Sequence, residues 1–244
     1  MSIQSTLGQV ERALAPAREL LRPILAEPAV LAGWGLVVVL SLGVLWWDLR
    51  ERNRAIPSLM KFVWTLVVAY SGPLGLGVYW YSGRTQIDHD STWRRGLRST
   101  AHCYSGCGAG EAVGFALLAG ILALSSTLLV TLGTFAFAYA FGYALTVGPL
   151  LQEGESLRVA VADAFYSETP SITVMEVAAI GTDLLLAAGA TMVEPLFWGA
   201  LVFSLSIGFA AAFPVNAALV YLGVKEGMEN SAEMGSGSRA QAGD

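Results

Sequence analysis

Long runs of apolar residues, separated by short polar segments, make up most of this chain. No charged residue occurs between Glu111 and Glu153, a stretch that suits two membrane crossings if the first begins near Ala101. A spanning helix needs about 20 apolar residues, and its backbone polar groups must be paired within the helix. The pattern predicts an all-α integral membrane protein, a bundle of about six transmembrane helices over residues 29–228. The other four crossings are expected at residues 29–47, 58–81, 171–190 and 195–213.

Two segments flank the predicted bundle. Residues 1–28 place apolar side chains such as Leu7 and Leu14 near helical spacing, with Arg12 and other charged residues between them. This pattern predicts an N-terminal amphipathic, interfacial helix, and a partly ordered tail is the alternative. Residues 229–244 are rich in Gly, Ser and Ala and have no apolar periodicity, so a disordered C-terminal tail is expected.

The composition agrees with burial in a bilayer. The chain is 55% hydrophobic and 14% charged, whereas soluble domains carry about 25% charged residues. It contains no run of Lys or Arg long enough to indicate a nucleic-acid partner. The lipid bilayer is therefore the expected partner, and a homo-oligomer stays open.

The distribution of basic residues predicts an orientation. With six helices and an internal N-terminus, ten of the 14 Lys and Arg residues lie on the cytoplasmic side. Because basic residues accumulate in cytoplasmic loops, we expect a multi-pass protein of the inner (cytoplasmic) membrane with both termini in the cytoplasm. The exception is a dense cluster between the first two helices, formed by Arg50, Arg52, Arg54 and Lys61.

Two of the predicted helices contain proline. Gly72 and Pro73 lie near the middle of the second run, where Pro removes a backbone hydrogen bond and usually kinks a helix. In the last helix, Pro214 is followed by Asn216, whose side chain could satisfy the carbonyl groups that Pro214 leaves free. Kinks of this kind occur in transporters and channels and also in inert bundles.

Three of the four Cys and His residues lie within six positions. Cys103 and Cys107 are one helical turn apart and share a face, which Glu111 continues, whereas His102 lies about 100° away from Cys103. Thiolate and imidazole suit monovalent copper or zinc. The pattern predicts a metal site with Cys103 and Cys107 as thiolate ligands, His102 as an accessory ligand and Glu111 as a further donor, although helix geometry disfavours all four binding together. A further donor would come from another helix, such as Met60, Met175 or Glu176, or from a second subunit.

The same segment has a purely structural interpretation. Gly106, Gly110 and Gly114 form a ladder of small residues at a spacing that promotes close helix packing in membranes. The two small Cys side chains would then serve packing as well. The sequence leaves both interpretations open.

Carboxylates at membrane depth are the second candidate site. Glu176 and Asp183 are seven residues apart and share one face of their helix, and Glu111 could approach the same interior. Ionisable groups inside a bilayer are costly and often mark a proton or substrate pathway. The alternative is a protonated acid that forms a hydrogen bond between helices.

Four stretches together resemble a family of bacterial and archaeal membrane proteins known as domain of unknown function 4396. Its most specific elements here are the His-Cys…Gly-Cys segment, continuing to Glu111, and the Pro214-Val215-Asn216 segment. Some members are labelled copper oxidases, so the resemblance implies copper. This chain lacks the His-rich termini and loops of many members. The stretches are residues 60–74, 102–111, 171–176 and 213–228.

The leading hypothesis is a membrane protein that binds copper or zinc at the start of the third helix, for transport, storage or sensing. The alternatives are a small transporter or permease that uses the intramembrane carboxylates and a non-catalytic scaffold. One Cys pair and two His residues are few ligands for haem or a multi-copper centre. We therefore assign no catalytic residue and no organic cofactor.

Overall fold

The computed structural model describes residues 3–87 and 89–225, and every regular element in these two ranges is a helix. The predicted disordered tail, residues 229–244, lies outside the described residues. The all-α prediction is confirmed for the described part. The elements are α1 (Ile3–Leu25), α2 (Pro28–Glu51), α3 (Ser58–Ser71), α4 (Pro73–Ser82), α5 (Thr92–Phe115), the π-helical segment η1 (Ala116–Ile121), α6 (Thr127–Gln152), α7 (Leu157–Ala187) and α8 (Pro195–Tyr221).

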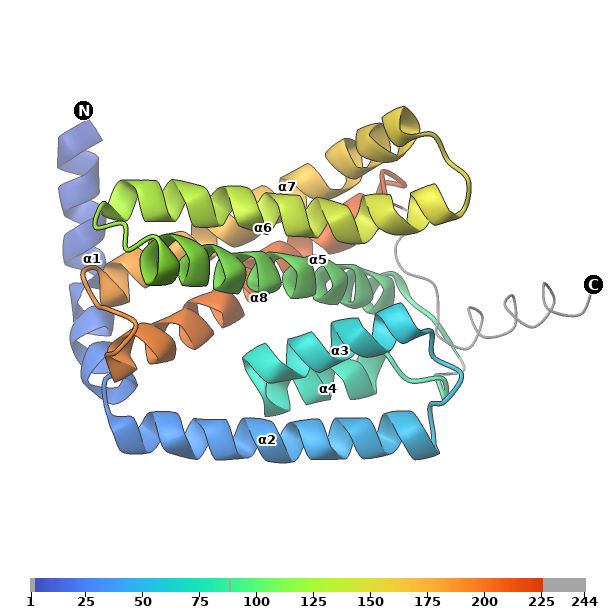
Figure 1. Ribbon diagram of the computed structural model, residues 1–244, viewed down its shortest axis with the longest axis horizontal. Helices are drawn as coiled ribbons and strands as arrows, with labels where there is room; N and C mark the ends of the chain where they lie inside the picture. Colours follow the sequence, from blue (N-terminus) through green and yellow to red (C-terminus); the bar gives the residue numbers. More distant parts are fainter. Residues whose placement is uncertain (1–2, 88, 226–244) are drawn as a thin grey trace, which may run out of the picture.

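Most of the helices run along one common axis (Figure 1). α5 lies at the centre and packs against α3, α6, α7 and α8, while α2 runs along one side. α1 crosses the end of the bundle at a steep angle (Figure 1). Leu21 and Leu25 of α1 pack there on a small apolar cluster at the end of α7 and the start of α8. The start of α8 and the end of α1 therefore lie at the same end of the molecule.

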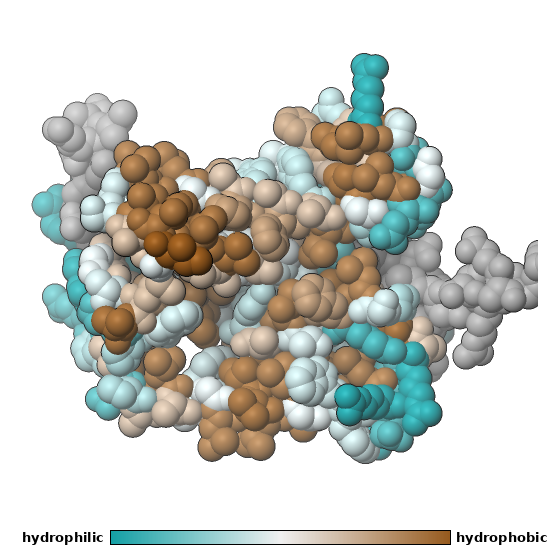
Figure 2. All heavy atoms as spheres, in the orientation of Figure 1, coloured by the Kyte–Doolittle hydropathy of each residue, from teal (hydrophilic) through white to brown (hydrophobic). Residues whose placement is uncertain are grey.

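Four of the helices, α2, α6, α7 and α8, are long and apolar enough to cross a membrane. Large apolar side chains on them are exposed, among them Leu36, Leu40 and Leu132. Figure 2 shows apolar surface across the middle of the molecule and polar surface gathered toward its ends. This distribution is that of a multi-pass membrane protein, whose lipid-facing side chains replace the polar surface of a soluble domain.

The prediction of one kinked spanning helix over residues 58–81 is wrong. α3 and α4 are two short antiparallel helices, and the Trp64 ring of α3 lies edge-on to the Tyr79 ring of α4 at 5.4 Å. With 14 and 10 residues, they extend only about 21 and 15 Å, less than the hydrocarbon core of about 30 Å. The chain reverses at Gly72, whose φ of +54° favours glycine, and Pro73 then begins α4.

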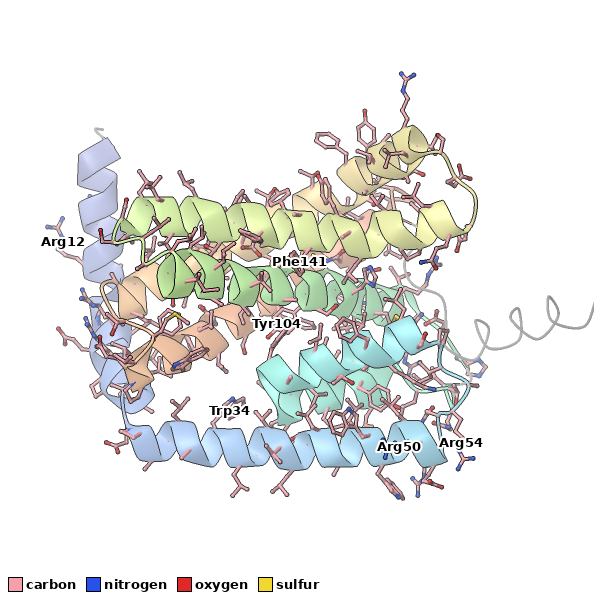
Figure 3. All side chains as sticks on the ribbon, in the orientation of Figure 1. Arg12, Trp34, Arg50, Arg54, Tyr104 and Phe141 are labelled. Carbon is pink, nitrogen blue, oxygen red and sulfur yellow. The ribbon has the colours of Figure 1, made fainter. Side chains whose placement is uncertain are left out.

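Both ends of this helical hairpin lie beside the end of α2. Asp48, in the last turns of α2, accepts a hydrogen bond from the Tyr79 hydroxyl at 2.8 Å and pairs with Arg84 at 2.8 Å. Asn53 follows α2 and accepts from the backbone N–H of Thr85 at 2.8 Å. The tip of the hairpin points toward the middle of the bundle, where Gly72 meets Trp34 of α2 (Figure 3).

α5 begins at Thr92, earlier than the position near Ala101 expected from the apolar pattern. Its N-terminus is capped by Ser91, whose hydroxyl accepts from the backbone N–H of Arg94 at 3.3 Å. The helix is rich in Gly, Ser and Cys and is buried along most of its length. Because the neighbouring helices shield α5 on most sides, its polar residues do not have to face lipid.

The three predicted packing glycines of α5 lie against α6. A Cβ atom on Gly110 would lie 2.4 Å from the carbonyl oxygen of Phe137, and one on Gly106 would lie 2.9 Å from the Cα of Gly142. Gly114 faces Thr134 in the same way. The glycine ladder is thus a contact within one chain, and it brings the two backbones close together.

Pro214 lies within α8, which continues to Tyr221. The expected role of Asn216 differs from the observed one. Its amide donates to the carbonyl oxygen of Ala212 at 3.3 Å, and its own side-chain oxygen accepts from the Lys225 ammonium at 3.2 Å. Asn216 therefore joins a polar cluster beyond the end of α8 and does not satisfy the carbonyl group that Pro214 leaves free, which is that of Ala210.

Candidate functional site

The polar groups of the bundle interior gather where α5 and α7 pack against each other. The two helices run in the same direction (Figure 1), and Cys103 of α5 lies beside Ser171 of α7, with 3.9 Å between Sγ and Oγ. On α5, Cys107 and Glu111 follow Cys103 at four-residue spacing and share its face. On α7, the facing ionisable residues are Glu168, Glu176 and Asp183.

At the centre of this interface lie two carboxyl groups. Glu111 is 4% exposed and Glu176 is 0% exposed. The two side chains interact electrostatically and lie within hydrogen-bonding reach of each other. Among the described residues, neither oxygen of Glu176 nor Oε1 of Glu111 receives a hydrogen bond from a conventional donor. A proton held between the two carboxyl groups would satisfy two of these three oxygens, because a protonated acid is a donor.

The two cysteines complete the centre of the site. Both are free thiols and both are buried. Cys107 interacts with Cys103 on one side and with Glu176 on the other. Close approach of α6 encloses it, since a Cβ on Gly142 would lie 3.4 Å from the Cys107 sulfur. The thiols thus lie next to the carboxyl pair, away from solvent.

On the side toward η1, the interior polar groups continue to Asp183. A small pocket of about 20 Å³ is lined by Glu111 and Asp183, with the hydroxyl-bearing residues Thr131, Thr134 and Ser204 in its wall. Asp183 is also an electrostatic neighbour of Glu111. Of the predicted pathway residues, Glu176 is therefore buried in the interior, and the half-buried Asp183 lines the pocket together with Glu111.

On the opposite side of the carboxyl pair, a buried ion pair closes the interior. Lys225, beyond the end of α8, lies 2.7 Å from Oε1 of Glu168, and their side chains are 10% and 4% exposed. Thr146 of α6 donates to the same carboxylate oxygen at 3.2 Å, and Asn216 accepts from Lys225. Three helices, α6, α7 and α8, and the segment after α8 meet at this cluster.

His102 faces this ion pair. Its electrostatic neighbours are Glu168 and Lys225, and it interacts with the backbone at Leu145. It therefore does not join Cys103 and Cys107, because adjacent residues of a helix point about 100° apart. In residues 3–87 and 89–225, no group of three or more His, Cys, Asp or Glu side chains is arranged to hold a metal ion. The four residues expected as ligands are divided between two places.

Sequence reasoning missed Glu168 and Lys225. The apolar run was taken to start at Ser171, so Glu168 fell outside the predicted helix, although α7 in fact starts at Leu157. The sequence did contain a signal for Glu168, because this residue precedes Glu176 by eight positions and lies near the same helix face. Nothing in the pattern placed Lys225 against α7, since that contact depends on how the chain turns after α8.

A second group of hydroxyls lies where the hairpin meets the bundle. The hydroxyls of Ser71 and Tyr104 are 2.7 Å apart, and the Tyr104 ring, labelled in Figure 3, packs edge-on against Phe209 at 5.1 Å. Ser71 and Phe209 also line a cavity of about 60 Å³. This contact holds the hairpin tip against the same α5 helix that carries the thiols.

Comparison with known proteins finds one similarity. The model of a protein family described as "Domain of unknown function (DUF4396)" matches residues 92–225. The match covers α5, α6, α7 and α8 and includes the thiols, the carboxyl pair and the Glu168–Lys225 ion pair. The stretch at residues 60–74 that also carries the resemblance lies outside the matched range. No curated protein and no solved structure matches the chain.

Proposed function

This chain belongs to the DUF4396 family, a family of unknown function, and from its interior we propose that it is a small proton-coupled membrane transporter. The proton would be carried by the carboxyl pair Glu111 and Glu176. The observation that supports this proposal is that the two acids are buried together and that three of their four oxygens lack conventional donors. Two carboxylates this close, away from water, cannot both be ionised. In the proposed mechanism, the pair would take up or release a proton when its surroundings change.

The neighbours of the pair support a pathway through the bundle. On one side lie the pocket with Asp183 and the hydroxyl groups, and on the other lie His102 and the Glu168–Lys225 ion pair. Groups that can accept and donate protons thus follow one another along the α5–α7 interface. Intramembrane acids arranged in series are typical of proton relays in pumps and transporters. The ion pair would act as the gate at one end of this series.

The hairpin gives further support. A pair of short helices that enters the bundle and returns places non-helical backbone at Gly72, which is tolerated at membrane depth only where protein or a water-filled cavity surrounds it. Broken helices of this type occur at the binding sites of transporters. The cavity beside Ser71 and Phe209 is a candidate for part of the route of the second, co-transported solute.

The test is proton flux into liposomes that contain the purified protein and a pH-sensitive dye, driven by a potassium diffusion potential. Glu176→Gln keeps the shape of the side chain but cannot carry a proton, so we expect the flux to fall at least about tenfold. Glu155→Gln, at an exposed position between α6 and α7, is the matched control and should leave the flux unchanged. Equal flux in the wild type and in Glu176→Gln, with both proteins monodisperse, would refute the proposal.

The arrangement of helices also supports a revised topology of five crossings, by α2, α5, α6, α7 and α8, in which the hairpin enters and leaves on one side. The end of α2, both ends of the hairpin and the start of α5 then share one face of the membrane. Of the 13 Lys and Arg residues in the described ranges, ten lie on this face and only Arg12, Arg18 and Arg22 on the other. The basic cluster from Arg50 to Lys61, which did not fit the orientation predicted with six helices, lies on the basic face in this topology. The basic residues on this face are Arg50, Arg52, Arg54, Lys61, Arg84, Arg94, Arg95, Arg98, Arg158 and Lys225.

Under the positive-inside rule, this basic face is cytoplasmic. The C-terminal end of α8 is then inside the cell and α1 is outside, so this proposal replaces the expectation that both termini are cytoplasmic. α1 would lie along the outer surface of the inner membrane as an interfacial helix, which agrees with its steep angle to the bundle (Figure 1).

A soft metal ion is the second candidate, and one observation favours it. Cys103 and Cys107 lie one helical turn apart and both interact with the Glu176 carboxyl group, so donors for zinc or copper occur in one region, although these side chains would have to move to hold an ion together. The test is metal content by mass spectrometry after growth with copper and zinc. Near-stoichiometric metal that is lost in Cys103→Ser/Cys107→Ser would support a site with two thiolates. Absence of metal from both proteins would remove this candidate.

A further inference from the structure

A pocket on the outer surface of the bundle lies between the end of α2 and the start of α3. It has a volume of about 590 Å³, within the usual range for ligand sites. Arg50, Arg54 and Lys61 line it, with Glu51 as the one acid in its wall. Figure 3 shows Arg50 and Arg54 at the end of α2, where polar surface gathers in Figure 2. The excess of cations gives the pocket a net positive charge.

The charges are held in place by the turn that joins the two helices. The Lys61 ammonium donates to the carbonyl oxygen of Arg54 at 2.8 Å, and the Arg54 guanidinium donates to the carbonyl oxygen of Arg50. Glu51 pairs with Arg54 at 3.5 Å, but both side chains are more than half exposed. An exposed pair of this kind is weak, so Arg54 can turn toward a stronger anion.

The rest of the pocket wall is mainly apolar, and its two aromatic side chains are exposed. Trp46 of α2 and Phe62 of α3 are 47% and 53% exposed. The Trp46 indole N–H donates to the Thr65 hydroxyl at 3.2 Å, which fixes the ring against α3. The pocket thus combines a cationic end near the membrane surface with an aromatic wall that continues toward the hydrocarbon. A free anion would use only the first of these features.

From this combination we propose that the pocket between α2 and α3 binds the headgroup of an anionic phospholipid, with an acyl chain along Trp46 and Phe62. Arg and Lys are the side chains that pair with phosphate, and basic pockets between transmembrane helices bind anionic headgroups. The site is separate from the carboxyl pair, so its occupant does not depend on proton transport. By holding α2 against α3, the lipid would stabilise the base of the hairpin.

The experiment measures phospholipid retained by the delipidated, full-length protein after incubation with phosphatidylglycerol or phosphatidylcholine, by native mass spectrometry. We expect the wild type to retain phosphatidylglycerol in preference to phosphatidylcholine. Lys61→Gln should weaken retention about fivefold, and Arg50→Gln/Arg54→Gln/Lys61→Gln should weaken it roughly a hundredfold. Arg158→Gln removes one exposed charge at the start of α7, away from the pocket, and should retain lipid as the wild type does.

Three results would overturn the proposal. In the first, the triple variant retains as much phosphatidylglycerol as the wild type does. In the second, Arg158→Gln loses as much lipid as Lys61→Gln, which would indicate that retention responds to net charge alone. Displacement of the lipid by millimolar inorganic phosphate would show that the site recognises a free anion. Phe62→Ala distinguishes lipid binding from binding of a free anion. It leaves the cations in place but removes part of the aromatic wall, so it should weaken retention of the lipid. The melting temperature of each variant in detergent shows whether it is folded.

Discussion

At the scale of single residues, Gly110 determines how closely α5 approaches α6. A Cβ at this position would lie 2.4 Å from a backbone oxygen of α6, and backbone can move only with the whole helix. We expect Gly110→Ala to destabilise the protein by about 1–3 kcal/mol, the usual cost of overpacking. The measurement is unfolding in detergent followed by circular dichroism.

Gly148 of α6 provides the control for this change. A Cβ there meets nothing within 4 Å, so Gly148→Ala should be neutral or slightly stabilising, as Ala is the better helix former. Equal losses of stability in the two variants would mean that the Gly110 contact does not determine the packing of these helices.

The buried ion pair makes a second prediction at this scale. Removing one member of a buried pair leaves an uncompensated charge and typically costs about 3–5 kcal/mol. Lys225→Met should therefore destabilise the protein strongly, because Glu168 has a side chain only 4% exposed. Lys225→Met/Glu168→Gln should recover most of the loss, since no isolated charge remains. Thermal melts of the two variants test this, and a double variant as unstable as the single one would contradict it.

Residue types were easier to predict than residue partners. Sequence alone placed Glu176, Asp183 and the two thiols in the bundle interior, because charged and polar residues in apolar runs are conspicuous. It also grouped His102 with the thiols, since these residues are adjacent in the chain. In the structure His102 turns toward Glu168 and Lys225, two residues that no local pattern connects with it.

At the scale of elements, the hairpin of α3 and α4 is the feature that most changes the interpretation. Ser58 and Gln86 are both exposed and lie near its two ends. If the hairpin re-enters, Ser58→Cys and Gln86→Cys should be labelled by a membrane-impermeant maleimide from the same side of sealed vesicles. The native thiols are buried and should remain unlabelled in the folded protein. Labelling from opposite sides would instead require a single crossing helix.

The hairpin could not be predicted from the hydrophobic pattern. α3 and α4 together contain 24 helical residues, which is also the length of one spanning helix. A Gly-Pro step within such a run is compatible with a kink and with a reversal. What decides between them is the positive φ of Gly72 together with the tight contact of Gly75 with Val67. Both depend on tertiary packing.

At the scale of the whole molecule, the proposed five crossings would place the two ends of the bundle on opposite faces of the membrane. We expect a fluorescent protein fused after residue 244 to fold in the cytoplasm and fluoresce. An epitope placed before α1 should be reached by antibody on spheroplasts without permeabilisation. Antibody access to the N-terminal epitope only after permeabilisation, together with a fluorescent C-terminal fusion, would restore the arrangement with both termini inside.

The helical bundle itself could be predicted because each apolar run is long and continuous. The number of crossings that we propose, five, differs from the predicted six because of the hairpin. The hairpin has the composition of a crossing helix but consists of two short antiparallel helices. The apolar pattern also placed the start of α5 near Ala101 and not at Thr92, because the first turns of this helix are polar. α5 tolerates its Gly, Ser and Cys residues because protein surrounds most of it.

The short length of the hairpin also has a consequence for biosynthesis. As α3 and α4 leave the ribosome, neither is long enough to be held in the bilayer by itself, and the backbone at Gly72 is still unshielded. The surfaces that cover the tip belong to α2, which is already made, and to Tyr104 and Phe209, which are made later. We therefore expect the hairpin to wait at the cytoplasmic surface of the translocon and to enter the membrane only after α8 has been synthesised.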